Sequence, residues 1–204
     1  MTTRSSRRRR AATLIALGFG YFVDSGEEQS MGVLYPAIKA LWGLSNFQLG
    51  LVGTVRTMMA ALSAPLWGFA ADRLSRKLVL FIGTGVWGIW TLICGLVPSF
   101  GALLVIRTIS GIGLGCLLPA TFSLLSDTFA PHRRGRALGA LGGVGALGII
   151  AGVLAMGFLA SNDPWLWGVA KWRWGFFVLV GMSVLSGVLI LLMVREPVRG
   201  EAEP

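Results

Sequence analysis

The chain has 204 residues, of which 54% are hydrophobic and only 13% are charged. A soluble globular domain carries about 25% charged residues, and a disordered chain combines low hydrophobicity with high charge. The composition therefore excludes a disordered chain and argues against a soluble enzyme. The net charge of +9 does not indicate nucleic acid binding, because the basic residues stand in short clusters between long apolar runs, as in loops between membrane spans.

Six stretches are apolar over the roughly 20 residues that a helix needs to cross a bilayer. They cover residues 11–36, 47–71, 78–98, 101–127, 136–160 and 174–194. The chain is thus predicted to be an all-α membrane protein, a bundle of six transmembrane helices in the lipid bilayer. Residues 1–10 would form a basic arm, and residues 195–204 would begin a loop or tail.

The distribution of basic residues predicts how the bundle is oriented. Most arginines and lysines fall on the side that holds both termini, whereas only Lys39, Lys171 and Arg173 fall on the other side. Because the basic side faces the cytoplasm, both termini are expected to be cytoplasmic. The cell (inner) membrane is the expected location.

The first stretch is unusual because its apolar part, residues 11–23, is too short to cross a bilayer alone. The polar segment 24–30 follows, and apolar residues resume at Met31. Basic residues before a short apolar run also occur in signal peptides, but no small-x-small cleavage site follows Val23. We favour one membrane helix with a polar middle.

Five charged residues inside the predicted spans are candidates for function, since each costs about 2.5–3.5 kcal/mol to insert. Asp24, Glu27 and Glu28 share one face of the first helix by their spacing. Arg56 lies near the middle of the second span and Arg107 lies in the fourth. We expect these opposite charges to pair across a polar cavity that binds solute or protons; the alternative is static ion pairs. The same face is extended by Tyr21 and Tyr35.

Glycines inside the spans predict close helix packing. Gly148 and Gly152 in the fifth span are four residues apart, and small residues at this spacing let helix backbones approach closely. The pattern L-G-x-x-G begins at Leu49 in the second span and at Leu138 in the fifth. This weak internal sequence similarity agrees with a three-plus-three inverted repeat.

The connection after the second span carries a recognisable motif. It reads Gly68-x-x-x-Asp72-Arg73-x-Ser75-Arg76-Lys77 and resembles the signature G-x-x-x-D-R-x-G-R-R/K of the major facilitator superfamily, with Ser75 in place of glycine. Further stretches are similar to other motifs of this family: Arg107-x-x-x-Gly111-x-Gly113, Asp127, Pro131, Arg134-Gly135-Arg136 and Arg195-Glu196-Pro197.

The stretch from Asp72 to Arg136 looks most like the spinster and organic-solute branches of this family. Two features depart from known branches. Spinster-like members tend to have a glutamate where this chain has Leu114, and the fifth span lacks the glycine-proline pair of drug antiporters.

The resemblance implies half of a major facilitator fold and secondary active transport of a small organic solute, coupled to protons, by alternating access. It also implies a cytoplasmic latch in which Asp72, Arg73 and Arg76 contact Asp127 and a helix end. The alternative is that these arginines only enforce topology. The full set assigned to the latch is Gly68, Asp72, Arg73, Arg76, Lys77, Asp127, Arg134 and Arg136.

Members of this family usually have twelve spans, with solute held between two six-helix halves, and this chain corresponds to the first half. We therefore expect either a truncated piece or a half that pairs with itself or with another six-span protein. A non-transporting scaffold or regulatory half is the alternative function. No enzyme activity, cofactor or metal is expected, because the single histidine, His132, lies in a loop and Cys94 and Cys116 lie in apolar runs.

Overall fold

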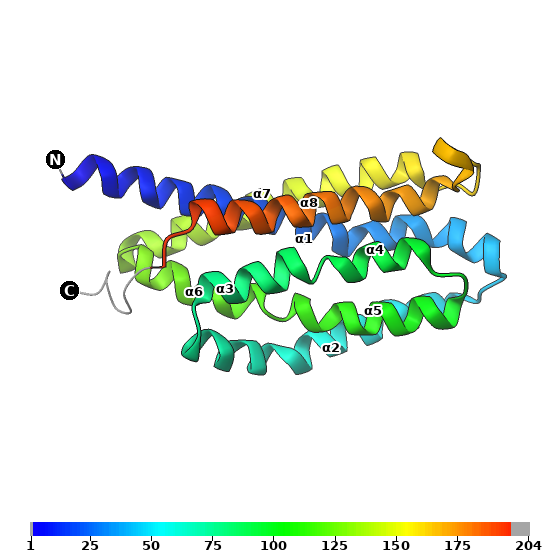
Figure 1. Ribbon diagram of the computed structural model, residues 1–204, viewed down its shortest axis with the longest axis horizontal. Coiled ribbons are helices and arrows are strands. Elements are labelled where there is room, and N and C mark those ends of the chain that lie inside the picture. Colours follow the sequence, from blue (N-terminus) through cyan, green and yellow to red (C-terminus); the bar gives the residue numbers. More distant parts are fainter. Residues whose placement is uncertain (1, 197–204) are drawn as a thin grey trace.

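The structure, a computed structural model, describes residues 2–196, and the regular elements of this part are helices (Figure 1). We refer to α1, α2, α3–α4, α5–α6, α7 and α8 as the first to sixth spans. The helices are α1 (Thr2–Trp42), α2 (Asn46–Arg73), α3 (Arg76–Leu80), the π-helix η1 (Phe81–Val86), α4 (Ile89–Leu96), α5 (Phe100–Leu114), α6 (Leu117–Thr128), α7 (Pro131–Leu159), the 3₁₀ turn η2 (Leu166–Gly168) and α8 (Lys171–Met193).

Helix lengths and composition confirm the predicted all-α membrane bundle. Within the described residues, five segments are long and apolar enough to cross a membrane, namely 46–73, 76–96, 100–128, 131–159 and 171–193. The first span, α1, has 41 residues, but its middle is polar. It runs through residues 24–30 without a break, and its first turns include residues 2–10, which the sequence predicted as a separate basic arm.

Local sequence explains where several helices begin. Ser45 and Gln48 form a reciprocal capping box at the start of α2, and the Ser99 hydroxyl accepts a hydrogen bond from the Ala102 backbone at the start of α5. Such caps satisfy backbone N–H groups that have no partner within the helix. Pro131 occupies the first turn of α7, where the missing N–H of proline costs nothing.

Two spans that the sequence predicted as continuous helices are interrupted. The third span is π-helical over Phe81–Val86, and the fourth span breaks between α5 and α6 at Gly115 and Cys116. Glycines gather at both places, with Gly83, Gly85 and Gly88 in the third span and Gly111, Gly113 and Gly115 in the fourth. Glycine is a poor helix former, about 1 kcal/mol worse than alanine, so these stretches bend more readily than their neighbours.

The spans pack in a pattern that agrees with an inverted repeat. The first span contacts the fifth and sixth, the second contacts the fourth, and the third contacts the sixth. Exchanging the first with the fourth span, the second with the fifth and the third with the sixth converts the first–fifth pair into the fourth–second pair. The start of α1 and the end of α8 lie at the same end of the bundle (Figure 1).

Glycines allow the first and fifth spans to touch, as the sequence predicted. A Cβ atom added at Gly148 would lie 2.2 Å from the carbonyl oxygen of Phe22, and one at Gly152 would lie 2.7 Å from that of Gly26. No side chain fits between backbones at these distances. The crossing of α1 and α7 therefore depends on the absence of side chains at these positions.

The apolar core is divided into two clusters by a polar layer. One cluster includes Leu34, Leu103 and Phe176, and the other includes Leu17, Leu80, Leu124 and Ile190. In each of the first four spans, and in the sixth, a buried polar residue lies between the parts that contribute to the two clusters. These residues are Glu27, Arg56, Thr91, Arg107 and Ser183.

Candidate functional site

A buried charge cluster, which we define as Asp24, Glu27, Arg56 and Arg107, occupies this polar layer. Glu27 in α1 accepts hydrogen bonds on its Oε1 atom from Arg56 in α2 and from Arg107 in α5, each at 3.2 Å. The hydroxyl of Thr91 in α4 donates to the same oxygen at 3.1 Å. One carboxylate oxygen thus joins four spans. Both arginines pair with an acidic residue of the first span, as the sequence indicated.

Three members of the charge cluster are almost fully removed from solvent. The exposed fractions are 7% for Glu27, 6% for Arg56 and 2% for Arg107. Buried charges are tolerated only when they are paired and hydrogen-bonded. Two guanidinium groups and one carboxylate leave a net charge of +1, which an ionised Asp24 would balance.

The approach of α2 to α5 depends on one glycine. A Cβ atom at Gly111 would lie 2.3 Å from the carbonyl oxygen of Arg56. The backbone that carries Arg56 therefore packs directly on α5, one turn from Arg107. Gly111 belongs to the fourth-span motif, and this contact gives that glycine a physical role.

Asp24 differs from Glu27 although both lie on α1, three residues apart. The Oδ2 atom of Asp24 is buried and has no hydrogen-bond partner. The Nε atoms of Arg56 and Arg107 are also buried and have no hydrogen-bond partner. Asp24 as a whole is partly exposed. Asp24 is therefore the carboxylate of the cluster whose protonation can change without breaking a hydrogen bond to its Oδ2 atom.

The other predicted members of this face lie outside the cluster. Glu28 is exposed, so the prediction that all three acidic residues lie together is only partly met. Tyr21 lies against Gly145 of α7, and the hydroxyl of Tyr35 lies against Gly53 of α2. The helical spacing placed these residues on one broad face, but packing buries one edge of that face and exposes the other.

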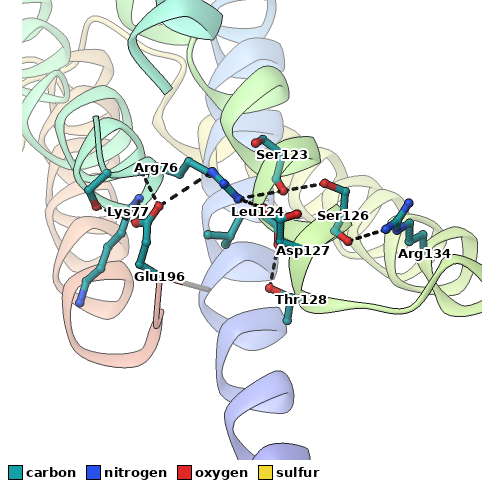
Figure 2. Close-up of polar contacts among 10 residues, drawn as sticks. Arg76, Lys77, Ser123, Leu124, Ser126, Asp127, Thr128, Arg134 and Glu196 are labelled. Atoms are coloured by element: carbon teal, nitrogen blue, oxygen red, sulfur yellow. Dashed lines mark hydrogen bonds and ion pairs between the residues drawn. The ribbon is translucent and has the colours of Figure 1, made fainter. Parts of the chain in front are cut away.

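A second group, which we call the helix-end network, consists of Arg76, Asp127 and Glu196. It joins the third, fourth and sixth spans at the end of the bundle where α1 begins and α8 ends. Arg76 at the start of α3 forms an ion pair with Asp127 of α6 and donates a hydrogen bond to the carbonyl oxygen of Ser123 at 3.3 Å. Figure 2 shows Arg76 between Asp127 on one side and Glu196 on the other. The Nε atom of Arg76 lies 3.9 Å from Oε1 of Glu196.

Glu196, which follows the sixth span, caps the start of the third. Its carboxylate accepts hydrogen bonds from the backbone N–H groups of Arg76 and Lys77, at 2.9 and 3.0 Å, and from the hydroxyl of Ser75 at 2.7 Å. Burial raises the pKa of the Glu196 carboxyl, but these hydrogen bonds and the charge of Arg76 lower it by more. The pKa of Glu196 therefore lies below its ordinary value of 4.5. The carboxylate therefore stays ionised at neutral pH.

The serine at position 75, where the family signature has glycine, is explained by its local contacts. Its hydroxyl accepts a hydrogen bond from the Leu78 backbone at the start of α3, and its φ angle is −66°. This position does not adopt the left-handed conformation that would favour the glycine of the family signature. Serine is instead a preferred residue at this helix start.

The remaining latch residues hold more peripheral places. Arg73 stacks on the ring of Phe69, 4.0 Å from its centroid, and Arg134 donates to the carbonyl oxygens of Ser126 and Phe129 at the end of α6 (Figure 2). Gly68 faces Pro119 of α6. Exposed or half-buried positions at the bundle end are held by Asp72, Lys77 and Arg136.

Two important residues were not singled out by the sequence. Thr91 is one of several hydroxyl residues in apolar spans, and nothing in its local pattern indicates that it contacts Glu27. Glu196 appeared only within the motif that ends the sixth span. No sequence rule joins it to Ser75, from which it is separated by four spans. Among the described residues, no group of three or more histidine, cysteine or acidic side chains could hold a metal.

Comparison with known proteins gives the family. Residues 17–204 match the model of the Major Facilitator Superfamily. The chain is 30% identical, over 89% of its length, to an uncharacterized MFS-type transporter of Mycobacterium tuberculosis, of which it covers 30%. It is 31% identical, over 72% of its length, to a putative niacin/nicotinamide transporter of Bacillus subtilis, of which it covers 37%.

A solved structure agrees with this result. A bacterial homologue of the human lysosomal transporter spinster, in an inward-facing and occupied conformation, matches with a TM-score of 0.83 and 25% identity over 96% of this chain. The chain covers 46% of that structure, so it spans less than half the length of these relatives. The relatives are named as transporters, which agrees with the expectation that the chain is not an enzyme. The chain, an integral multi-pass membrane protein with the fold of half a transporter, belongs to the Major Facilitator Superfamily.

Proposed function

We propose that the chain forms one half of a secondary transporter that moves a small organic solute across the membrane, coupled to protons, by alternating access. The observation that carries this proposal is the buried charge cluster. Intramembrane charges are costly and mark solute or proton pathways, and here three of them meet at a single carboxylate oxygen.

The two acidic residues of the cluster are proposed to have different tasks. Glu27 holds the second, third and fourth spans together through three hydrogen bonds. Asp24, with its unpartnered Oδ2 atom, binds and releases the proton. A solute or a conformational change that shifts Arg56 would change the charge around Asp24, and this couples solute movement to proton movement.

The helix-end network is proposed to act as a cytoplasmic latch. It joins the start of the third span to the ends of the fourth and sixth through Arg76, Asp127 and Glu196. Alternating access requires these ends to separate, so the network favours one access state and must open in each cycle. We expect Asp72→Asn to lower transport without lowering membrane insertion; normal transport by this variant would count against the latch.

Two further proposals concern partners and orientation. We propose that a second six-helix half covers the face that exposes Glu28 and Gln29 of α1, because polar side chains in mid-span face protein or water rather than lipid. The solute would lie between the halves. We propose, from the excess of basic residues at this end of the bundle, that this end and both termini face the cytoplasm.

The test uses the protein in proteoliposomes with an imposed pH gradient and labelled nicotinate and nicotinamide as the first probes. These probes are chosen because a relative is named as a putative niacin/nicotinamide transporter. Flux driven by the pH gradient is expected, and Asp24→Asn should remove its pH dependence. If Asp24→Asn, Glu27→Gln and Glu28→Gln all match the wild type, proton coupling at this cluster is wrong. If neither probe moves while the fold is intact, nicotinate and nicotinamide are excluded as solutes.

A further inference from the structure

A small polar cavity of about 20 Å³ lies beside Asp24 in the polar layer. It is formed by the first, second, third, fourth and sixth spans. An organic solute needs a pocket of roughly 300 Å³ or more, so this cavity is not a solute site. A single water molecule needs roughly 10–15 Å³. The charged and hydroxyl residues that line the cavity are Asp24, Glu27, Arg56, Thr84, Thr91, Ser110 and Ser183.

The hydroxyl groups in this lining have already donated their hydrogens elsewhere. Thr84 donates to the carbonyl oxygen of Leu80, and Ser110 donates to that of Arg107, each at 2.8 Å. Thr91 donates to Glu27, and Ser183 donates to the carbonyl oxygen of Thr84. A hydroxyl has one hydrogen and two lone pairs, so toward the cavity all four groups can act only as acceptors.

Asp24 and Arg56 complete the requirement for a small hydrogen-bonding occupant. The buried Oδ2 atom of Asp24 needs a donor, and the buried Nε atom of Arg56 needs an acceptor. A buried polar group left unpaired costs about 1–3 kcal/mol. Water is the smallest molecule that supplies two donors and an acceptor at once, and buried waters typically make about three hydrogen bonds.

We propose that this cavity binds one water molecule, which donates a hydrogen bond to Oδ2 of Asp24 and to a lining hydroxyl, and which delivers and removes the Asp24 proton. On loading, a hydronium ion transfers its proton to the Asp24 carboxylate, leaving a carboxylic acid and the water. On release, the carboxylic acid returns the proton to that water. No other reactant is needed. The proton role rests on the proposed function, whereas the water site stands on geometry alone.

The charged and titratable groups around Asp24 come from several spans. They are Tyr21, Glu27 and Glu28 on α1, Arg56 on α2 and Cys116 between α5 and α6. Glu27 accepts hydrogen bonds from two arginines and Thr91, and Glu28 is exposed. Asp24 and Glu27 both line the cavity, but the Oε1 atom of Glu27 already accepts three hydrogen bonds. Asp24 is the lining carboxylate with a buried oxygen that has no hydrogen-bond partner, so the water exchanges its proton there.

The first experiment is a crystal structure in a lipid phase at a resolution that shows ordered waters. We expect density for one water within hydrogen-bonding distance of Oδ2 of Asp24. A cavity without density, or density with the short oxygen distances of a sodium ion, would overturn the proposal. This result does not depend on any transport assay, so it separates the water site from the proposed function.

The second experiment measures hydrogen–deuterium exchange of the Asp24 carboxylic acid by infrared spectroscopy at acidic pH, with the band assigned by Asp24→Asn. Gly88→Ala adds a methyl group to the cavity lining and displaces the Ser183 hydroxyl, because a Cβ there would lie 2.3 Å from it. Ser110→Ala removes one acceptor more gently. We expect both to slow exchange, by roughly tenfold for the loss of a hydrogen bond near 1.4 kcal/mol.

Matched controls come from the same part of the chain. Gly101→Ala adds a methyl group in open space, and Thr108→Val removes a hydroxyl that, like Ser110, bonds back within α5 but does not line the cavity. Both controls should exchange like the wild type. Equal rates in Ser110→Ala, Gly88→Ala and the controls would overturn the proton role, as would the absence of an exchanging Asp24 band.

Discussion

The buried charge cluster and the helix-end network are built on the same plan with opposite signs. In the cluster, one anion, Glu27, is shared by two cations, Arg56 and Arg107. In the network, one cation, Arg76, lies between two anions, Asp127 and Glu196. The anions differ in exposure, because the side chains of Glu27 and Asp127 are 10% and 12% exposed, whereas that of Glu196 is 34% exposed.

This difference in exposure separates two mechanical roles. Breaking a buried ion pair leaves a charge in a medium that cannot solvate it, at a cost of about 3–5 kcal/mol. An exposed pair is replaced by water at a cost of about 0–1 kcal/mol. The cluster is therefore suited to hold spans together throughout a transport cycle. Within the network, the contact of Glu196 is the part suited to open and close, because Arg76 and Asp127 are nearly buried.

The largest expected effect is that of Glu27→Gln. This change leaves two buried guanidinium groups without a carboxylate, so we expect a loss of about 3–5 kcal/mol in the free energy of unfolding. Denaturant unfolding of the protein in lipid micelles measures it. Glu28→Gln, at an exposed position on the same helix, is the control. A loss below about 1 kcal/mol for Glu27→Gln would mean that the cluster is not the structural centre described here.

Arg76→Gln is expected to lower the free energy of unfolding by a smaller amount. This change removes the charged bonds to Asp127 and Ser123 and the ion pair with Glu196, and hydrogen bonds to charged groups contribute about 1.5–3 kcal/mol. The same unfolding assay applies, with the exposed Arg136→Gln as the matched control. If Arg76→Gln costs more than Glu27→Gln, the proposed division between a holding cluster and an opening network is wrong.

The contact between α2 and α5 provides a third comparison. Gly111→Ala places a Cβ 2.3 Å from the Arg56 carbonyl oxygen and should cost about 1–3 kcal/mol by overpacking. Gly101→Ala, on the same helix in open space, should leave stability unchanged or raised, since alanine favours helix. Thermal unfolding of the two variants side by side checks this prediction; equal melting temperatures would contradict it.

The smallest effect concerns pH. The pKa of Glu196 in the folded chain lies below its ordinary value of 4.5, so its stabilising contacts are fully present above that value. They are lost as the pH falls through the lower folded pKa. We expect wild type to be more stable than Glu196→Gln at neutral pH, by less than about 1 kcal/mol. This difference in stability should disappear below pH 4.5. A difference that grows on acidification would contradict the lowered pKa of Glu196.

Charge and hydropathy were sufficient to predict the membrane bundle. Long apolar runs identified the spans, and the positions of Glu27, Arg56 and Arg107 indicated pairing because isolated charges in mid-span are too costly. Periodicity could not separate Asp24, Glu27 and Glu28, because residues on one helix face differ in burial only through the helices that pack there. That packing places Glu27 against Arg56 and Arg107 and leaves Glu28 exposed.

Long-range polar contacts and helix irregularities were harder to predict. Glu196 reaches Ser75 and Arg76 although four spans follow Ser75 in the sequence before Glu196, and Thr91 reaches Glu27 from the third span. The glycines of the third and fourth spans were visible in the sequence. Whether such a glycine permits close packing or interrupts a helix depends on which residue packs against it. At Gly83, that residue is Cys116 of the fourth span.

The most direct test of the division of labour within the buried charge cluster is a pH titration of its carboxyl groups by infrared difference spectroscopy, in lipid, on wild type, Asp24→Asn and Glu27→Gln. The account predicts one titrating carboxylic acid band from this cluster that is absent in Asp24→Asn. A band that persists in Asp24→Asn and disappears in Glu27→Gln would show that Glu27, not Asp24, exchanges the proton.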